Sequence, residues 1–278
     1  MEKKNAMMKK MDNKVINLHY TDICNYRCRF CHSRFGITPL TLEDWKRIID
    51  NIICDVNVKR FNLAGGEPMA APYVQGLIDH IHSLHIDCSI ITNGSLLTPE
   101  FIDENKEKLS MIGISVDALS HKDNLALGRV NGSGKTLSPE QLELLGEKIH
   151  ENNIRFKVNT VVNKINCHED FSGMIRQLSP ERWKLLRMIA IEGKNDTAND
   201  LLISDEKFEE FALRHKALSP VVEDTKDIVS AYIVVNPKGQ LVDNSSGSYK
   251  MSRSLLTSTF GREFPKVAFN LAAYEKRY

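Results

Sequence analysis

Three cysteines lie within eight residues near the start of the chain, at Cys24, Cys28 and Cys31. The spacing C-x3-C-x2-C places three thiolates on one tight loop, where they could ligate three irons of a [4Fe–4S] cluster and leave the fourth iron open. The alternative is zinc, but a structural zinc site takes four protein ligands, and the nearest spare ligand, His32, directly follows Cys31. The spacing therefore favours a cluster with an open iron.

The chain has six cysteines in 278 residues, too few for a disulfide scaffold. The other three, Cys54, Cys88 and Cys167, stand singly in helix-like or strand-like segments. Single cysteines in such segments are usually buried structural thiols, and we expect that role for them.

Short β-branched segments alternate with amphipathic segments of helical length. Strands are predicted at Val15–Tyr20, Arg60–Leu63, Cys88–Thr92, Met111–Val116, Ile154–Val162 and Trp183–Ile191. Helices are predicted at Leu42–Cys54, Tyr73–Leu84, Pro99–Lys108, Pro139–Asn152, Cys167–Leu178 and Ser204–His215.

Four of the predicted helices have a capping residue at the expected place. Thr98 and Ser138 each precede a proline, which is favoured at the first helical position. Thr41 with Asp44 resembles a capping box, and Asn166 precedes Glu169 with the same spacing.

This alternation predicts an α/β fold with parallel strands, a partial (β/α)6 TIM-like barrel whose site lies at the carboxyl ends of the strands. An open dinucleotide-binding sheet is disfavoured because no Gly-x-Gly-x-x-Gly follows the first strand. We expect a flexible tail over residues 1–13, the barrel over 14–219, and an extension over 220–278. The extension carries a hairpin, Ala231–Val235 with Gln240–Asp243, and is expected to cover the barrel mouth.

The chain carries 37 basic and 36 acidic side chains, a formal net charge of +1. Such a balance gives no global field to attract nucleic acid or an anionic membrane, so neither is expected as a partner. No apolar run approaches the ~18 residues of a membrane span, and the first 13 residues lack a signal-peptide core. We expect a cytoplasmic monomer.

A second motif, Gly65-Gly66-Glu67-Pro68, directly follows the second predicted strand. Together with the cysteine motif it resembles the radical S-adenosylmethionine (SAM) superfamily. The resemblance implies that SAM binds the open iron through its amino and carboxylate groups. It also implies SAM contacts from Gly65, Gly66 and Glu67, from Asn93 and Ser95 after the third strand, from Ser115 at the end of the fourth, and from Arg129.

Basic residues alternate along two neighbouring predicted strands. By the strand period of two, Lys157 and Asn159 share one face of the fifth strand, and Arg182 and Lys184 share one face of the sixth. If both faces point into the barrel, three cations and an amide converge and could bind a triphosphate. The alternative is that Val158 and Trp183 face the interior.

The segments Phe156–Asn163, Leu178–Lys184 and Ile191–Asn195 resemble the viperin family of antiviral nucleotide dehydratases. This implies a radical SAM lyase that converts a ribonucleoside triphosphate (CTP, UTP or GTP) to its 3′-deoxy-3′,4′-didehydro analogue, with loss of the 4′ hydrogen and the 3′-hydroxyl. The product would terminate chain synthesis, and an external one-electron donor would be needed.

The viperin resemblance also implies individual roles. Arg60 stands where the family has a lysine near the phosphates, Tyr232 matches a tyrosine near the nucleotide, and Lys250 loosely matches a basic C-terminal tail. Asn159 is a candidate to orient the ribose, and Tyr232 a candidate proton or hydrogen donor. Two alternatives stay open: a radical SAM enzyme that acts on a peptide or activates another enzyme, and a zinc-stabilised binding module without catalysis.

Overall fold

The structure, a computed structural model, describes residues 14–33, 36 and 40–276. The tail expected over residues 1–13 and the last two residues therefore lie outside the described residues. The chain divides into two compact units, the first made of residues 1–23, 33–90 and 228–278, and the second of residues 24–32 and 91–227.

The first unit contains parallel strands with an antiparallel edge. Its strands are β1 (Lys14–Thr21), β2 (Val58–Gly65), most of β3 (Asp87–Thr92), β8 (Ile233–Val235), β9 (Gln240–Asp243) and β10 (Lys250–Ser254). Its helices are α2 (Leu42–Asp55), α3 (Val74–Ser83), α10 (Phe260–Glu263) and α11 (Leu271–Glu275). β1 pairs in parallel with β2 and β8, whereas β8 with β9 and β9 with β10 are antiparallel.

Helix α2 packs on one face of β1. It begins with the predicted capping box between Thr41 and Asp44. The buried ring of Trp45 meets the ring of Tyr20 edge-on at 6.3 Å. Because successive strand residues point to opposite faces, Asn17 lies on the face away from this contact.

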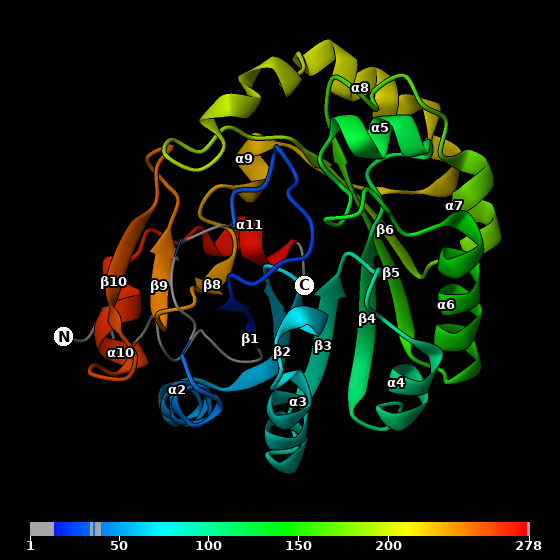
Figure 1. The fold of residues 1–278 in the computed structure, drawn as a ribbon. Helices are drawn as coiled ribbons and strands as arrows, with labels where there is room; N and C mark the ends of the chain where they lie inside the picture. Colours follow the sequence, from blue (N-terminus) through cyan, green and yellow to red (C-terminus); the bar gives the residue numbers. More distant parts are fainter. Residues whose placement is uncertain (1–13, 34–35, 37–39, 277–278) are drawn as a thin grey trace. The chain divides into compact units, whose positions relative to one another are not determined.

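The second unit is built on the parallel strands β4 (Leu109–Ser115), β5 (Arg155–Val162), β6 (Arg182–Arg187) and β7 (Val221–Glu223). Its helices are α4 (Pro99–Glu104), α5 (His121–Ala126), α6 (Pro139–Glu151), α7 (Ser172–Leu178) and α8 (Asp205–Arg214), and the short α9 (Thr225–Ile228) begins in it. Short 3₁₀ segments occur at Pro68–Ala70, Asp196–Leu201, Lys216–Leu218 and Phe264–Lys266. Figure 1 shows α6 and α7 flanking the strands of this unit.

One face of β5 and β6 packs against these helices. The ring of Phe156 lies 5.7 Å from that of His150 on α6. The ring of Trp183 lies 5.0 Å from His215, which caps α8, and 6.2 Å from Phe171, which precedes α7. The even-numbered residues of β5 and the odd-numbered residues of β6 therefore face the helices.

The six predicted strands and six predicted helices are all present, and Thr98 and Ser138 cap α4 and α6 as expected. The predicted hairpin is formed by β8 and β9. Several predicted ends were wrong: β6 stops at Arg187, α4 at Glu104, and α7 begins only at Ser172. Helix α5 was not predicted.

The prediction that Asn166 caps helix α7 was also wrong, because its side chain forms hydrogen bonds elsewhere. Its amide donates to the carbonyls of Asp117, at 2.7 Å, and Val161, at 2.9 Å, and its oxygen accepts from the Asn163 backbone. Glu169 accepts instead from the backbone of Leu119. Tertiary contacts thus outweigh a local capping pattern.

No helix among the described residues is long and apolar enough to cross a membrane.

Candidate active site

The cysteine loop belongs to the second unit and is held there through its backbone. Arg27 N donates to the carbonyl of Gly128 at 3.0 Å, and Arg29 N to that of Leu127 at 2.9 Å. The amide of Asn195 donates to the carbonyl of Phe30 at 3.0 Å, and the Phe30 side chain packs in a buried apolar cluster. The loop is therefore shaped by residues about a hundred or more positions away.

The three loop thiols are partly exposed. Two of the sulfurs receive hydrogen bonds, Cys24 from Tyr26 N at 3.4 Å and Cys28 from Arg129 Nη1 at 4.0 Å. Burial raises the pKa of the Cys28 thiol to about 12, and the Arg129 guanidinium acts in the opposite direction. Donors aimed at sulfur, with a cation nearby, suit a thiolate ligand.

Among the residues that the structure describes, no three His, Cys, Asp or Glu side chains gather closely enough to hold one metal ion. A [4Fe–4S] cube does not need such a gathering, because each cysteine ligates a different iron. The donor set of the loop therefore fits the cube rather than a tetrahedral zinc site.

An amide and hydroxyl network ties the cysteine loop to the end of β3. Asn25 Nδ2 donates to Ser95 Oγ at 2.8 Å, and Asn93 Nδ2 donates to Asn25 Oδ1 at 2.9 Å. Ser95 Oγ also donates to Asn93 Oδ1 at 2.7 Å. The structure thus brings together Asn93 and Ser95, both predicted SAM contacts, and adds Asn25, which we did not predict.

Arg129 lies beside the cysteine loop, as the predicted role requires, but it already has a carboxylate partner. Its Nη1 lies 2.6 Å from Asp117 Oδ2, and its Nη2 donates to the Ser115 carbonyl at 2.6 Å. Both side chains are almost fully buried, 7% and 2% exposed. Burial raises the pKa of Asp117, and the Arg129 charge lowers it.

The Gly65-Gly66-Glu67-Pro68 motif belongs to the first unit and presses against the end of β1. A Cβ on Gly66 would lie 2.2 Å from the carbonyl oxygen of Ile23, and one on Gly65 would lie 2.5 Å from that of Thr21. The two glycines therefore allow two backbone segments to approach closely, and their expected contacts with SAM stay a prediction.

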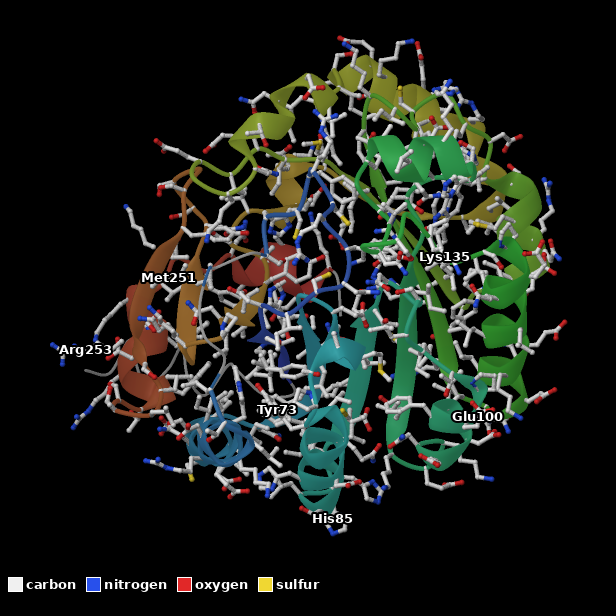
Figure 2. All side chains as sticks on the ribbon, in the orientation of Figure 1. Tyr73, His85, Glu100, Lys135, Met251 and Arg253 are labelled. Carbon is white, nitrogen blue, oxygen red and sulfur yellow. The ribbon has the colours of Figure 1, made fainter. Side chains whose placement is uncertain are left out.

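Two further contacts hold this motif in shape. Glu67 is buried, and its carboxylate accepts from Met69 N at 3.1 Å. The Tyr20 hydroxyl donates to the Pro68 carbonyl at 2.8 Å, and Figure 2 shows Tyr73, whose ring lies 5.8 Å from that of Tyr20.

The predicted nucleotide-binding residues of the second unit share one face. Lys157 lies opposite Arg182, and Asn159 lies between Ser115 and Lys184 in the paired strands. Since Phe156 and Trp183 face the helices, these polar side chains point the other way. This result excludes the alternative in which Val158 and Trp183 line the interior. Asn159 is 8% exposed, and its Oδ1 accepts no hydrogen bond from any described residue.

Sequence reasoning missed Glu223, which forms an ion pair with Lys184. The two side chains are 4% and 5% exposed. Glu223 ends the three-residue strand β7, which is too short for a periodicity signal, so nothing in the sequence pointed to it.

The remaining predicted residues belong to the first unit. Arg60 is a buried residue of β2, and Tyr232 directly precedes β8. Lys250 begins β10, the edge strand, which β9 and β8 separate from β1, so it is not brought beside Arg60. Figure 2 shows Met251 and Arg253 on this same edge strand.

A polar row that we did not predict crosses the face of β1 and β2 away from α2. Ser89 Oγ donates to Asn62 Oδ1 at 2.8 Å, Asn62 Nδ2 to Asn17 Oδ1 at 2.9 Å, and Asn17 Nδ2 to the Ile233 carbonyl at 3.1 Å. By strand alternation, Arg60 shares this face with Asn62.

Comparison with known proteins identifies the family of this chain. The Radical SAM superfamily matches residues 18–178. An S-adenosylmethionine-dependent nucleotide dehydratase of Selenomonas ruminantium is 37% identical over 270 residues, covering 95% of this chain and 98% of the relative. A dehydratase of the same name from Flammeovirga pacifica is 30% identical, covering 92% and 91% of the two chains.

Solved structures show the same fold. Streptococcus suis SuiB bound to S-adenosylmethionine superposes with a TM-score of 0.70 at 14% identity, covering 99% of this chain and 71% of SuiB. This confirms the α/β fold of the partial-barrel, radical SAM type. Enzymes of this superfamily use a [4Fe–4S] cluster and SAM, which excludes the zinc-stabilised binding module. The chain belongs to the radical SAM superfamily and, within it, to the S-adenosylmethionine-dependent nucleotide dehydratases.

Proposed function

We propose that this radical SAM enzyme converts CTP, UTP or GTP to the 3′-deoxy-3′,4′-didehydro analogue by removal of the 4′ hydrogen and loss of the 3′-hydroxyl as water. The observation that carries the proposal is the polar face of β5 and β6, where Lys157, Arg182 and the buried amide of Asn159 lie opposite the helices. Relatives named nucleotide dehydratase support a nucleotide as substrate.

The cofactors would be held by the residues already described. Cys24, Cys28 and Cys31 would ligate the cluster, and Gly65, Gly66, Glu67, Asn93, Ser95, Ser115 and Arg129 would surround SAM. When bound, these cofactors supply the radical that takes the ribose hydrogen. Arg129 would bind the SAM carboxylate while it stays paired with Asp117.

The chain's own residues bind and orient the nucleotide. Lys157 and Arg182 supply charge to the phosphates, and each charge-assisted contact contributes about 1.5–3 kcal/mol. Asn159 Oδ1, which accepts no hydrogen bond from a described residue, would accept one from a ribose hydroxyl. Arg60 would add a phosphate contact and Tyr232 a proton or hydrogen atom late in the reaction. Lys250, on the edge strand β10, would contact the nucleotide as part of the basic C-terminal tail.

The wider role follows from the product. A nucleotide without a 3′-hydroxyl terminates chain synthesis, so we propose a part in antiviral defence. An external one-electron donor supplies the electrons, and the proposal includes a cytoplasmic monomer as the working form.

The test is to incubate the reconstituted enzyme with SAM, a reductant and one of CTP, UTP, GTP or ATP. We expect one or more of the first three to increase 5′-deoxyadenosine formation above the level without nucleotide, and to yield a product lighter by one water in the mass spectrum. If no nucleotide does so, the proposed substrate class is wrong.

A further inference from the structure

Asn25 lies in the cysteine loop, directly after Cys24. Its side-chain amide is bonded at both of its polar atoms to the end of β3. Asn25 Nδ2 donates to Ser95 Oγ at 2.8 Å, and Asn25 Oδ1 accepts from Asn93 Nδ2 at 2.9 Å. These partners are 70 and 68 residues away in the sequence. Asn25 thus joins the loop that would hold the cluster to two residues that we propose contact SAM.

The two partners of Asn25 are also bonded to each other. Asn93 Oδ1 accepts from Ser95 Oγ at 2.7 Å and from Ser95 N at 2.9 Å. The three side chains therefore form a closed ring, in which each is held by the other two. A side chain that is ordered when the protein folds does not lose that freedom again when a ligand binds. The ring thus orients Asn93 and Ser95 in advance.

The ring also limits what the Ser95 hydroxyl can offer to a ligand. A hydroxyl group has one donor and two acceptor positions. The donor is used on Asn93, and the Asn25 amide occupies one acceptor position. One acceptor position is left, so Ser95 would accept from a hydroxyl or ammonium group of SAM and would not donate to its carboxylate.

SAM would meet the two regions at the same time. The family resemblance places its amino and carboxylate groups on the open iron of the cluster, and implies contacts from Asn93 and Ser95 with the same molecule. When one ligand binds two regions, its affinity depends on how well their separation and orientation are fixed beforehand. The two hydrogen bonds of Asn25 connect these regions directly.

We propose, on the basis of the SAM contacts proposed above, that Asn25 is a positioning residue for SAM. It fixes the cysteine loop relative to the end of β3, and it keeps the Ser95 hydroxyl as a hydrogen-bond acceptor for the cofactor. Asn25 acts through Asn93 and Ser95, and the role does not require it to touch SAM.

The experiment measures SAM binding to the cluster-loaded enzyme in the absence of any nucleotide. Calorimetry gives the affinity, and the change that SAM causes in the electron paramagnetic resonance signal of the reduced cluster gives a second readout. We expect Asn25→Ala to bind SAM about 3- to 10-fold more weakly, the equivalent of one neutral hydrogen bond. The spectral change should then need correspondingly more SAM. Iron content should stay at the wild-type level, because the three cysteines are unchanged.

Two further variants make the result specific. Ser95→Ala removes one of the Asn25 hydrogen bonds without altering the cysteine loop. If Asn25 acts through Ser95, Asn25→Ala should cause a smaller loss of SAM affinity in the Ser95→Ala background than in the wild type.

Asn152→Ala is the matched control in the same unit. Asn152 Nδ2 donates to Asp103 Oδ1 at 2.8 Å, so this substitution also removes a side-chain hydrogen bond of an asparagine, but one between α4 and the end of α6. It should leave SAM binding unchanged. Denaturant unfolding shows that each variant is folded under the conditions of the binding measurement.

Unchanged SAM affinity of folded, iron-loaded Asn25→Ala would overturn the inference, as would strictly additive effects of Asn25→Ala and Ser95→Ala. Loss of iron by Asn25→Ala would overturn it as well, because Asn25 would then shape the loop itself. The measurement needs no substrate, so it is separate from the proposed function. If no nucleotide is turned over but Asn25→Ala still weakens SAM binding, the positioning role stands and only the substrate class is wrong.

Discussion

The cysteine loop and the nucleotide face of the same unit are built in different ways. Backbone bonds to Leu127 and Gly128 shape the loop, and the side chains around it are already bonded to each other, as Arg129 is to Asp117. The nucleotide face is a row of side chains on β5 and β6, placed by strand alternation and register. One region is fixed before any ligand arrives, whereas the other retains an unsatisfied acceptor on Asn159.

Substitutions in the two regions should therefore have different effects on folding stability and on substrate binding. A change beside the loop breaks a buried bond between protein groups, so it should cost folding stability as well as activity. A change on the nucleotide face removes a side chain that we propose binds the substrate, so its main cost should be to substrate binding.

The largest effect should come from the loop ligands. Replacing Cys24, Cys28 and Cys31 together by Ala should abolish iron uptake and activity, measured by iron content, visible absorption and 5′-deoxyadenosine formation. Cys54→Ala is the control. The prediction that Cys54 is buried was wrong, because it lies exposed on α2, and its substitution should change neither iron content nor activity. Retention of iron by the triple variant would contradict the assignment of the loop.

Arg129→Met should come next, with a loss of about 3–5 kcal/mol in the free energy of unfolding at neutral pH, because Asp117 is left as an unpaired buried charge. The pKa of Asp117 is already raised by burial and should rise further. A carboxyl with a raised folded-state pKa is least costly when protonated, so the variant should regain stability as the pH falls from neutral toward acid.

The control for this variant is Arg29→Met in the same loop. Arg29 pairs with Asp200, but the two side chains are 37% and 62% exposed. We expect a loss below about 1 kcal/mol, because exposed ion pairs contribute little. Equal losses for both arginines, measured by chemical denaturation, would mean that burial does not distinguish the two pairs.

Lys157→Met should lower kcat/KM for the triphosphate by about 10- to 100-fold, because one charge-assisted contact with the phosphates is lost. Arg155→Met is the matched control: Arg155 lies on the same face of β5, but its Nε donates to the Ser110 carbonyl at 3.1 Å. A loss of stability without a change in KM would place Lys157 with the structural residues instead.

An effect of similar size, about 1–3 kcal/mol of unfolding free energy, is expected for Gly66→Ala, since the new methyl group meets backbone that has to shift. Gly132→Ala is its control, because a Cβ there has nothing within 4 Å. Denaturant unfolding of the two variants compares them, and equal stability would refute the close-approach explanation.

Local patterns predicted the framework well. Alternating apolar segments located β1 to β6, and Thr41, Thr98 and Ser138 marked true helix starts because a cap depends on neighbours within three residues. The strand period also placed Lys157 and Arg182 on one face.

Long-range partners could not be predicted. Asn166 has the spacing of a cap, yet its amide bonds to Asp117, 49 residues away. Similarly, the counter-charges of Arg129 and Lys184 depend on which strands pair, and no local spacing encodes that. Resemblance suggested the SAM role of Arg129, and the strand period suggested the phosphate role of Lys184. Both identified the cations but not their partners.

The backbone bonds between the cysteine loop and Gly128 also affect the order in which the enzyme matures. Cys28 and Arg129 are 101 residues apart in sequence, so a chain made from its amino end exposes all three thiols long before the residues that shape their loop exist. We therefore expect the loop to reach its final shape, and to become ready for the cluster, only after α5 has folded.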